Sequence, residues 1–212
     1  MSDEPRTRSV KISDDERRGW SSDRPRRDGE PSRPPSISVR GRVLSPSHLV
    51  RYSPGSLLVI VSPSSTERDR FAEQFIENGA FLLSLDKVRM RLAGRASEED
   101  IDGRAVEILH AAVRKRLEAN ETVVLAAEGL GAGEREAYVR MAASFKRPSH
   151  LILVDTVSHG VDKDDRAALN DLRRRLDAGE LGAEGFVTAM RLSGQSLTEL
   201  KRIVFQRPPR DD

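Results

Sequence analysis

The chain has 212 residues, of which 37% are hydrophobic and 33% are charged. This length and composition fit one soluble domain of ordinary size with additional polar sequence attached. The absence of cysteine excludes disulfides, zinc–thiolate sites and cysteine nucleophiles. The four histidines are scattered rather than spaced as metal ligands, so we expect no metal site built on imidazole.

Hydropathy indicates where in the cell the protein is expected. No apolar run approaches the roughly eighteen residues of a membrane span, and the first twenty residues lack the apolar stretch of a secretory signal. We therefore expect a cytoplasmic protein.

The net charge of +2 is unevenly distributed. Residues 1–55 carry 12 Lys and Arg against 8 Asp and Glu, which gives +4 and leaves −2 for the rest of the chain. Residues 1–36 are rich in Arg, Asp, Ser and Pro and contain little that a core could bury. We predict a disordered basic tail and lead-in over residues 1–50, a folded domain over 51–207 and a short polar tail over 208–212.

The basic tail offers one binding hypothesis. Trp20 lies among Arg17, Arg18, Arg24, Arg26 and Arg27, a combination that suits nucleic-acid phosphates and one stacked base. The alternative is a solvated, low-complexity tail of mixed charge. After the tail, alternation over residues 37–52 predicts a short strand or an extended lead-in.

The segment 57–61, Leu-Leu-Val-Ile-Val, predicts a buried strand, and the eight residues that follow match the frame of a phosphate-binding loop. That loop, G-x-x-x-x-G-K-[ST], closes backbone amides around phosphate oxygens. Here Ser62 and Glu67 stand at the glycine positions, Arg68 at the lysine and Asp69 at the Mg-binding hydroxyl. The frame is present, but each of its four diagnostic residues is replaced.

The replacements change the charge of the loop. Glu67, Arg68 and Asp69 sum to −1, where an intact motif supplies +1. Two like charges about 4 Å apart repel by roughly 4 kcal/mol at an effective dielectric near 20. The candidate phosphate ligands of this degenerate Walker A loop are Ser62, Ser65, Thr66, Arg68 and Asp69, and Asp69 also offers a metal contact. The alternative is a self-capped helix, with Thr66 as N-cap and Asp69 three residues later as a capping box.

Strands and helices alternate from residue 56 onward, which predicts an α/β fold with a parallel sheet and helices on both faces. Ser97 is expected to cap a long helix whose apolar positions recur at helical spacing and face the core. These positions are Ala105, Ile108, Leu109, Ala112, Val113 and Leu117. The other expected helices are 68–77, 134–145, 165–178 and 183–192, and the other expected strands are 80–84, 122–126, 151–155 and 202–205.

With these elements in order, residues 56–206 resemble the polynucleotide-kinase-like branch of P-loop kinases, which is related to zeta toxins. In that family a strand ends in an Asp followed three residues later by an Arg, as in Asp86 and Arg89. The resemblance implies that Asp86 takes the proton from the acceptor hydroxyl and that Arg89 orients it. A carboxylate at the carboxyl edge of a parallel sheet lies beside the phosphate crevice. The alternative is that Asp86 is a helix N-cap.

A second family element is also altered. The family's third strand ends in D-A-T-N-L with an Arg a few residues later, and residues 126–130 with Arg135 occupy that place. Ala127 and Leu130 match, whereas the Asp, Thr and Asn have become Ala126, Glu128 and Gly129. Glu128 is either a replacement acid in the crevice or a solvated loop carboxylate.

Kinases of this type close a lid whose arginines neutralise the transferring phosphate. Residues 162–179 lie where the lid is expected, and Arg173 and Arg175 are its candidate phosphate contacts. The alternative is an exposed helix with a solvated arginine face.

Three functions are compatible with these patterns. The first is a non-catalytic or weakly nucleotide-binding homologue that acts on a protein or nucleic-acid partner through the basic tail and the lid arginines. The second is an active kinase that transfers phosphate from Mg-ATP to the 5′-hydroxyl of a polynucleotide or to a small-molecule hydroxyl. The third is a structural or regulatory subunit, and fold alone does not choose among them. We favour the first.

Overall fold

The computed structural model describes residues 37–95, 97–156 and 163–207. These described residues belong to one compact unit. Part of the predicted lead-in takes part in the fold, because Arg42 and Val43 join the central sheet and Val50 is buried. The prediction of a disordered tail lies, for residues 1–36, outside the described residues.

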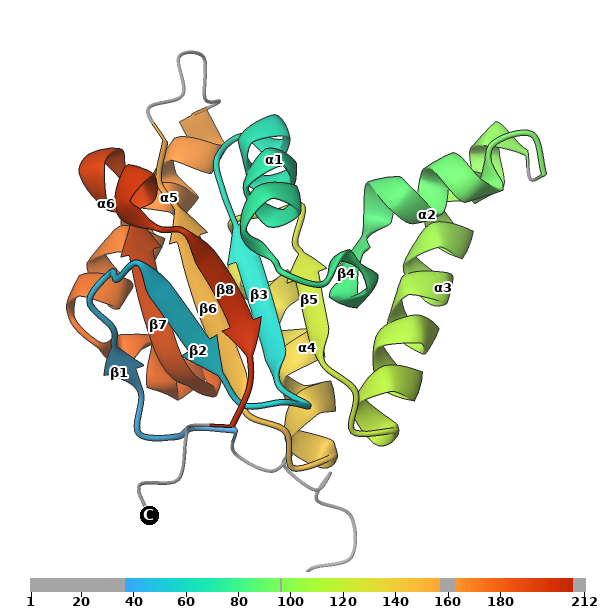
Figure 1. The fold of residues 1–212 in the computed structure, drawn as a ribbon. Helices are drawn as coiled ribbons and strands as arrows, with labels where there is room; N and C mark the ends of the chain where they lie inside the picture. Colours follow the sequence, from blue (N-terminus) through green and yellow to red (C-terminus); the bar gives the residue numbers. More distant parts are fainter. Residues whose placement is uncertain (1–36, 96, 157–162, 208–212) are drawn as a thin grey trace, which may run out of the picture. The chain divides into compact units, whose positions relative to one another are not determined.

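Six parallel strands form the central sheet, in the order β1-β7-β6-β3-β5-β4 (Figure 1). Their bounds are β1 Arg42–Val43, β3 Leu57–Val61, β4 Leu82–Ser84, β5 Val123–Ala126, β6 Ser149–Val154 and β7 Phe186–Leu192. A second, two-stranded sheet pairs β2 (Leu49–Tyr52) with β8 (Arg202–Phe205) in parallel, and we call it the β2–β8 ribbon.

The connecting segments are mostly helical, as a parallel sheet requires. The α-helices are α1 Ser65–Phe75, α2 Leu85–Leu92, α3 Glu98–Glu118, α4 Ala132–Ser144, α5 Lys163–Asp177 and α6 Gly194–Glu199. Two 3-10 helices, η2 (Gly79–Phe81) and η3 (Glu180–Glu184), precede β4 and β7. Among the described residues, none of these helices combines the length and the apolar character that crossing a bilayer requires.

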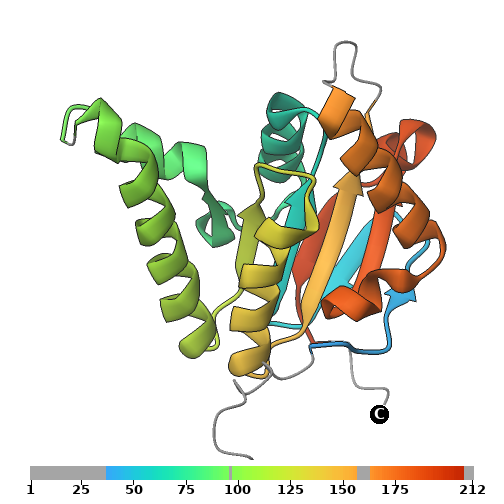
Figure 2. The same ribbon diagram turned by 180° about the vertical axis from the view of Figure 1, so that it is seen from behind.

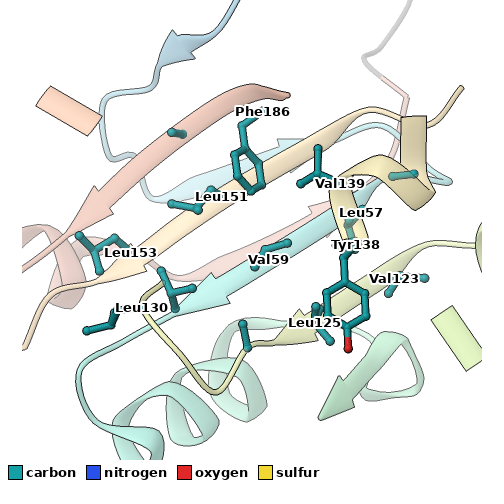
Figure 3. Packing of buried hydrophobic residues seen from close by; sticks show 14 of the residues in the cluster. Leu57, Val59, Val123, Leu125, Leu130, Tyr138, Val139, Leu151, Leu153 and Phe186 are labelled. Carbon is teal, nitrogen blue, oxygen red and sulfur yellow. The ribbon is translucent and has the colours of Figure 1, made fainter. Parts of the chain in front are cut away.

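Side chains of β3 alternate between two cores. Leu57, Val59 and Val61 belong to the cluster formed with α3, α4 and α5, which cover one face of the sheet (Figures 2 and 3). Leu58 and Ile60 point the other way, toward α1 and the β2–β8 ribbon (Figure 1). A strand buried on both faces is apolar at every position, which is why 57–61 contains no polar residue. The prediction of an α/β fold with helices on both faces is confirmed.

Several element assignments were wrong. Residues 183–192 were expected to be helical, yet β7 occupies most of this segment. Gly185 has a φ of +96°, which ends η3, and β7 then fills the place between β1 and β6, so sheet pairing decides its conformation. Helix α6 was not predicted, and the first residues of the expected strand 80–84 form η2 instead.

The apolar stripe of α3 is confirmed in its main part. Ala105, Leu109, Val113 and Leu117 are buried and four residues apart. Ile108 was expected in the core but is 45% exposed. It lies one residue before Leu109 and therefore about 100° away around the helix axis.

Candidate functional site

The candidate site lies at the carboxyl edge of the central sheet. Because β3, β4, β5 and β6 are parallel, the residues that follow them meet at one edge. Ser62 follows β3, Asp86 lies in the first turn after β4, Glu128 follows β5 by two residues, and Asp155 follows β6 directly. The sequence singled out the first three but not Asp155.

The loop after β3 is short, because α1 begins at Ser65 rather than at residue 68. Ser64 is the N-cap, and its side chain accepts a hydrogen bond from the Glu67 amide at 3.3 Å. The predicted capping box of Thr66 and Asp69 is therefore wrong, and Thr66 instead lies exposed in the first turn beside the exposed Ser65. The earlier start has a local cause, since Ser64 supplies the side-chain oxygen that an N-cap needs.

Backbone amides near this loop already have partners. The Ser64 amide donates to Ser62 Oγ at 3.3 Å, and the Arg68 amide donates to the Ser64 carbonyl at 2.9 Å. The amides of Ser64, Glu67 and Arg68 therefore all donate to oxygens of this same segment. In an intact loop, backbone amides in this region face a phosphate.

Arg68, at the lysine position of the motif, is only 1% exposed. Its Nη1 donates to the Ala127 carbonyl at 2.7 Å and its Nε to Asp69 Oδ1 at 2.8 Å. Its Nη2 lies 3.4 Å from Asp86 Oδ2. The guanidinium thus ties α1 to the end of β5 and to the start of α2, and does not project into solvent as a free cation.

Arg89 joins three carboxylates from different elements. It donates to Asp86 Oδ1 at 3.1 Å, to Asp102 Oδ1 at 2.8 Å and to Glu128 Oε1. The pKa of Arg89 is raised above its ordinary value, chiefly by the hydrogen bond to Asp102 and further by Glu128 and Asp86, against a smaller opposing effect of burial. Its charge is therefore fixed.

We call Arg68, Arg89, Asp69, Asp86, Asp102 and Glu128 the crevice cluster. Two guanidinium groups and four carboxylates give it a net charge of 2 − 4 = −2. Asp86 is not the N-cap of α2, because Ser84 holds that position and accepts from the Lys87 amide at 3.2 Å. Glu128 is not a free loop carboxylate, because it pairs with Arg89.

The loop after β5 is closed by a carboxylate that the sequence did not indicate. Glu134, in the first turn of α4, accepts hydrogen bonds from the amides of Glu128 at 3.1 Å and Gly129 at 2.8 Å. These amides resemble an anion site at a helix N-terminus, and an internal anion already occupies it.

Arg135, the arginine that matches the family pattern, is 2% exposed. Its Nε and Nη2 donate to the two carboxylate oxygens of Glu184 at 3.1 and 3.2 Å, and its Nη1 donates to the Leu130 carbonyl. Glu184, in η3, is itself buried and also pairs with Arg175 at 2.5 Å. This bidentate pair fixes α4 against η3.

The two predicted lid arginines lie on α5, which packs on the core through Leu169, Leu172 and Leu176. Arg175 pairs with Glu184, and Arg173 donates through Nε to Asp155 Oδ2 at 2.9 Å. Neither fits the solvated-face alternative, which instead describes Arg174 with its exposed partner Asp171.

Asp155 is enclosed by two arginines. Arg191 of β7 donates through Nε to Asp155 Oδ2 at 2.6 Å, and Arg173 of α5 donates to the same oxygen. Burial by itself raises the pKa of Asp155, but the hydrogen bonds and charges of Arg173 and Arg191 outweigh it and the pKa is lowered. Asp155 is therefore ionised and acts as the counter-ion that holds α5 to the sheet.

Comparison with known proteins is informative for this edge and its flanking elements. Residues 63–163, just under half of the chain, match a family model described as an AAA domain. The fold is P-loop NTPase-like. The match also supports a kinase-like member of that superfamily. A search of curated proteins finds no match.

At this edge of the sheet, sequence analysis missed Asp155, Arg191, Glu134 and Glu184. Asp155 could have been found from the sequence, because it directly follows an apolar strand. Asp86, which was singled out, likewise comes just after a strand, two residues beyond Ser84. Glu184 and Arg191 could not have been found in this way, because their segment was assigned to a helix and only the β7 pairing places them beside α4, α5 and β6.

The residues present do not fit Mg-ATP well. A magnesium-bound triphosphate needs free cations and free amides, whereas Arg68 is bonded to carboxylates and the amides of Ser64 and Glu67 are engaged. Asp69, at the Mg-binding position, is held by Arg68.

Proposed function

We propose that this P-loop kinase-like domain is a non-catalytic homologue whose phosphate loop no longer holds a nucleotide, and that it acts by binding a partner. The observation that carries the proposal is the position of Arg68. The cation at the lysine position is buried and bonded to two carboxylates and a backbone carbonyl. A phosphate would have to displace those partners, and it would do so beside a cluster of net charge −2.

The other arginines of the site support the same conclusion. Arg89, Arg135, Arg173 and Arg175, the further candidates for stabilising a transferring phosphate, each pair with at least one carboxylate. Catalysis of phosphoryl transfer depends on positioned positive charge around the γ-phosphate. Here that charge is neutralised within the fold, and the former crevice acts as a structural ion-pair network.

The partner is proposed from the sequence rather than from the crevice. With the lid arginines engaged, the excess of positive charge lies in residues 1–55, which carry +4. An anionic partner, nucleic acid foremost, suits that charge, and such binding weakens as salt is added. Fluorescence anisotropy with a labelled single-stranded oligonucleotide, at several salt concentrations, tests this part. Salt-independent binding would favour an apolar protein interface.

The nucleotide part is tested by calorimetric titration of Mg-ATP into the full chain. The structure shows why the full chain is needed, since residues 37–50 contribute β1 and part of β2 to the fold. A variant with Ser62→Gly, Glu67→Gly, Arg68→Lys and Asp69→Ser restores the motif and serves as the positive control, with circular dichroism to verify its fold. We expect heat of binding for the restored loop and none for the natural chain.

Micromolar or tighter binding of Mg-ATP by the natural chain would overturn the proposal. The alternative would then be an active kinase acting on a 5′-hydroxyl or a small-molecule hydroxyl. Asp86, whose side chain is 44% exposed at the sheet edge, is the base of that alternative. Its test is turnover in Asp86→Asn, and normal turnover in that variant would remove Asp86 from the mechanism.

A further inference from the structure

A polar cluster lies inside the core, away from the crevice. His150 of β6 is opposite Thr188 of β7 in the sheet register, and His150 Nδ1 lies 2.8 Å from Thr188 Oγ1. Tyr52 of β2 stacks on the imidazole, with ring centroids 4.4 Å apart and an interplanar angle of 28°. All three residues are buried, with exposures of 4% for Tyr52 and 6% for His150 and Thr188. The cluster therefore joins the β2–β8 ribbon to the central sheet.

Hydrogen bonding in this cluster is incomplete. Tyr52 Oη and His150 Nε2 are both buried and have no hydrogen-bond partner within the described part of the protein. The Thr188 hydroxyl is close enough to Tyr52 to moderate the effect of burial, which raises the tyrosine's pKa, but the two hydroxyls do not meet with hydrogen-bond geometry. An unpaired buried polar atom costs about 1–3 kcal/mol. Two such atoms on stacked side chains are an unusual concentration of that cost.

The chemistry of the two atoms is complementary to a small polar molecule. No carboxylate is found among the causes that shift the pKa of His150, and burial lowers that pKa to about 4. The imidazole is therefore neutral at pH 7, so that one ring nitrogen donates and the other accepts. Whichever role Nδ1 takes with Thr188, Nε2 takes the opposite role. The Tyr52 hydroxyl can donate and accept, so both tautomers leave a site that water can complete.

We infer that Tyr52 and His150 form a buried binding site for water, in which an ordered molecule hydrogen-bonds to Tyr52 Oη and His150 Nε2. Internal waters of this kind satisfy buried polar groups that the protein leaves unpaired. The site makes the contact between the β2–β8 ribbon and the sheet a hydrated one. Tyr52 shares its buried core with apolar side chains such as Leu58, Ile152 and Ile203, so few other polar partners are at hand.

A crystal structure of the full chain tests the inference directly. We expect a density peak within hydrogen-bonding distance of both Tyr52 Oη and His150 Nε2. A map that shows other internal waters but no peak at this place would overturn it.

The stability of Tyr52→Phe provides a second test that depends on a sign. If water binds the hydroxyl, its removal takes a partner from the water and from the network, and the urea midpoint of unfolding falls. If the hydroxyl is unpaired, its removal deletes a buried orphan group, and the midpoint rises, which would contradict the inference. Tyr138→Phe is the matched control, because it alters the other tyrosine of the chain, whose hydroxyl is not among the buried unpaired groups. We expect its midpoint to stay near that of the natural chain.

Discussion

Arg68 and Arg135 are both almost completely buried, yet their charges are balanced in different ways. Arg135 pairs with Glu184, which is 8% exposed, through two nearly parallel hydrogen bonds. Arg68 pairs with Asp69 and Asp86, whose side chains are 37% and 44% exposed, and with the Ala127 carbonyl. The first pair has been removed from water as a unit. The second has one buried ion and two carboxylates that water still reaches.

This difference separates a structural pair from a remodelled site. A buried carboxylate that loses its cation cannot be rescued by solvent, whereas an exposed one can. We therefore expect the Arg135 pair to matter mainly for stability. We expect the crevice cluster around Arg68 to matter more for which ligands can bind there.

The largest effect is expected from Glu184→Ala. This change leaves Arg135 buried without a counter-charge, and breaking a buried pair in this way costs about 3–5 kcal/mol. Urea unfolding followed by circular dichroism measures the loss. Glu180→Ala is the control. Glu180 lies in the same 3-10 helix but is exposed, and its ion pair with the exposed Arg174 is long, at 3.9 Å. Equal losses in the two variants would contradict the distinction between buried and exposed pairs.

His150 extends the comparison to a buried ionisable group without a counter-charge. Its pKa of about 4 in the folded protein is below the value of about 6.5 in the unfolded chain. As the pH falls from 6.5 to 4, the unfolded state binds a proton first, so stability is full above this window and decreases through it. The expected loss is about 3 kcal/mol.

Urea unfolding across this pH window, beside His150→Gln, checks the sign. The glutamine variant lacks the titration and should show a shallower decline. An identical decline in both proteins would assign the pH dependence to other groups. Asp155 is separable, because its lowered pKa places its contribution below the ordinary aspartate range, where stability is lost as the pH falls further.

A smaller effect is expected from Arg68→Met. The substitution keeps an unbranched side chain in place of the aliphatic part of arginine, leaves Asp69 and Asp86 to be solvated, and deprives the Ala127 carbonyl of a donor. We expect a loss of about 1–2 kcal/mol in unfolding free energy. Arg70→Met, an exposed arginine of the same helix, is the control. A loss as large as that of Glu184→Ala would mean that the two buried arginines are equivalent.

The smallest effect is expected from Asp86→Asn. Its carboxylate is partly exposed, and Arg68 and Arg89 both retain other partners, so the loss should stay under about 1 kcal/mol. We also expect the difference from the natural chain to shrink as salt is added, because exposed pairs are screened. A large, salt-independent loss would show that the crevice cluster behaves as a buried pair.

The sequence predicted the fold well where the physical pattern was local. Leu57 to Val61 form an uninterrupted apolar run, and only a strand buried on both faces explains it in so short a segment. The stripe of α3 was equally clear at Ala105, Leu109, Val113 and Leu117. The pattern failed at 183–192, because Phe186, Ala189, Met190 and Leu192 suit a helix in isolation and only the neighbouring strands make them β7.

The candidate site was predicted in its positions but not in its contacts. Asp86, Arg89, Glu128 and Arg68 were each singled out, and the structure brings them together. Their mutual pairing was not foreseen, because it depends on distances across α1, α2 and the end of β5. Glu134 and Glu184 escaped notice because a carboxylate in a helix looks solvated until its partner is known.

By itself, the sequence determined the alternation of strands and helices, the residues that stand between β3 and α1 and the uneven distribution of charge, because each is carried by neighbouring residues. The tertiary structure alone decided which arginines are free. An ion pair forms between residues that are far apart along the chain, as Arg135 and Glu184 are, and its strength depends on burial that only the folded core creates. The difference between a cation offered to phosphate and one used to hold the fold together is therefore settled by packing.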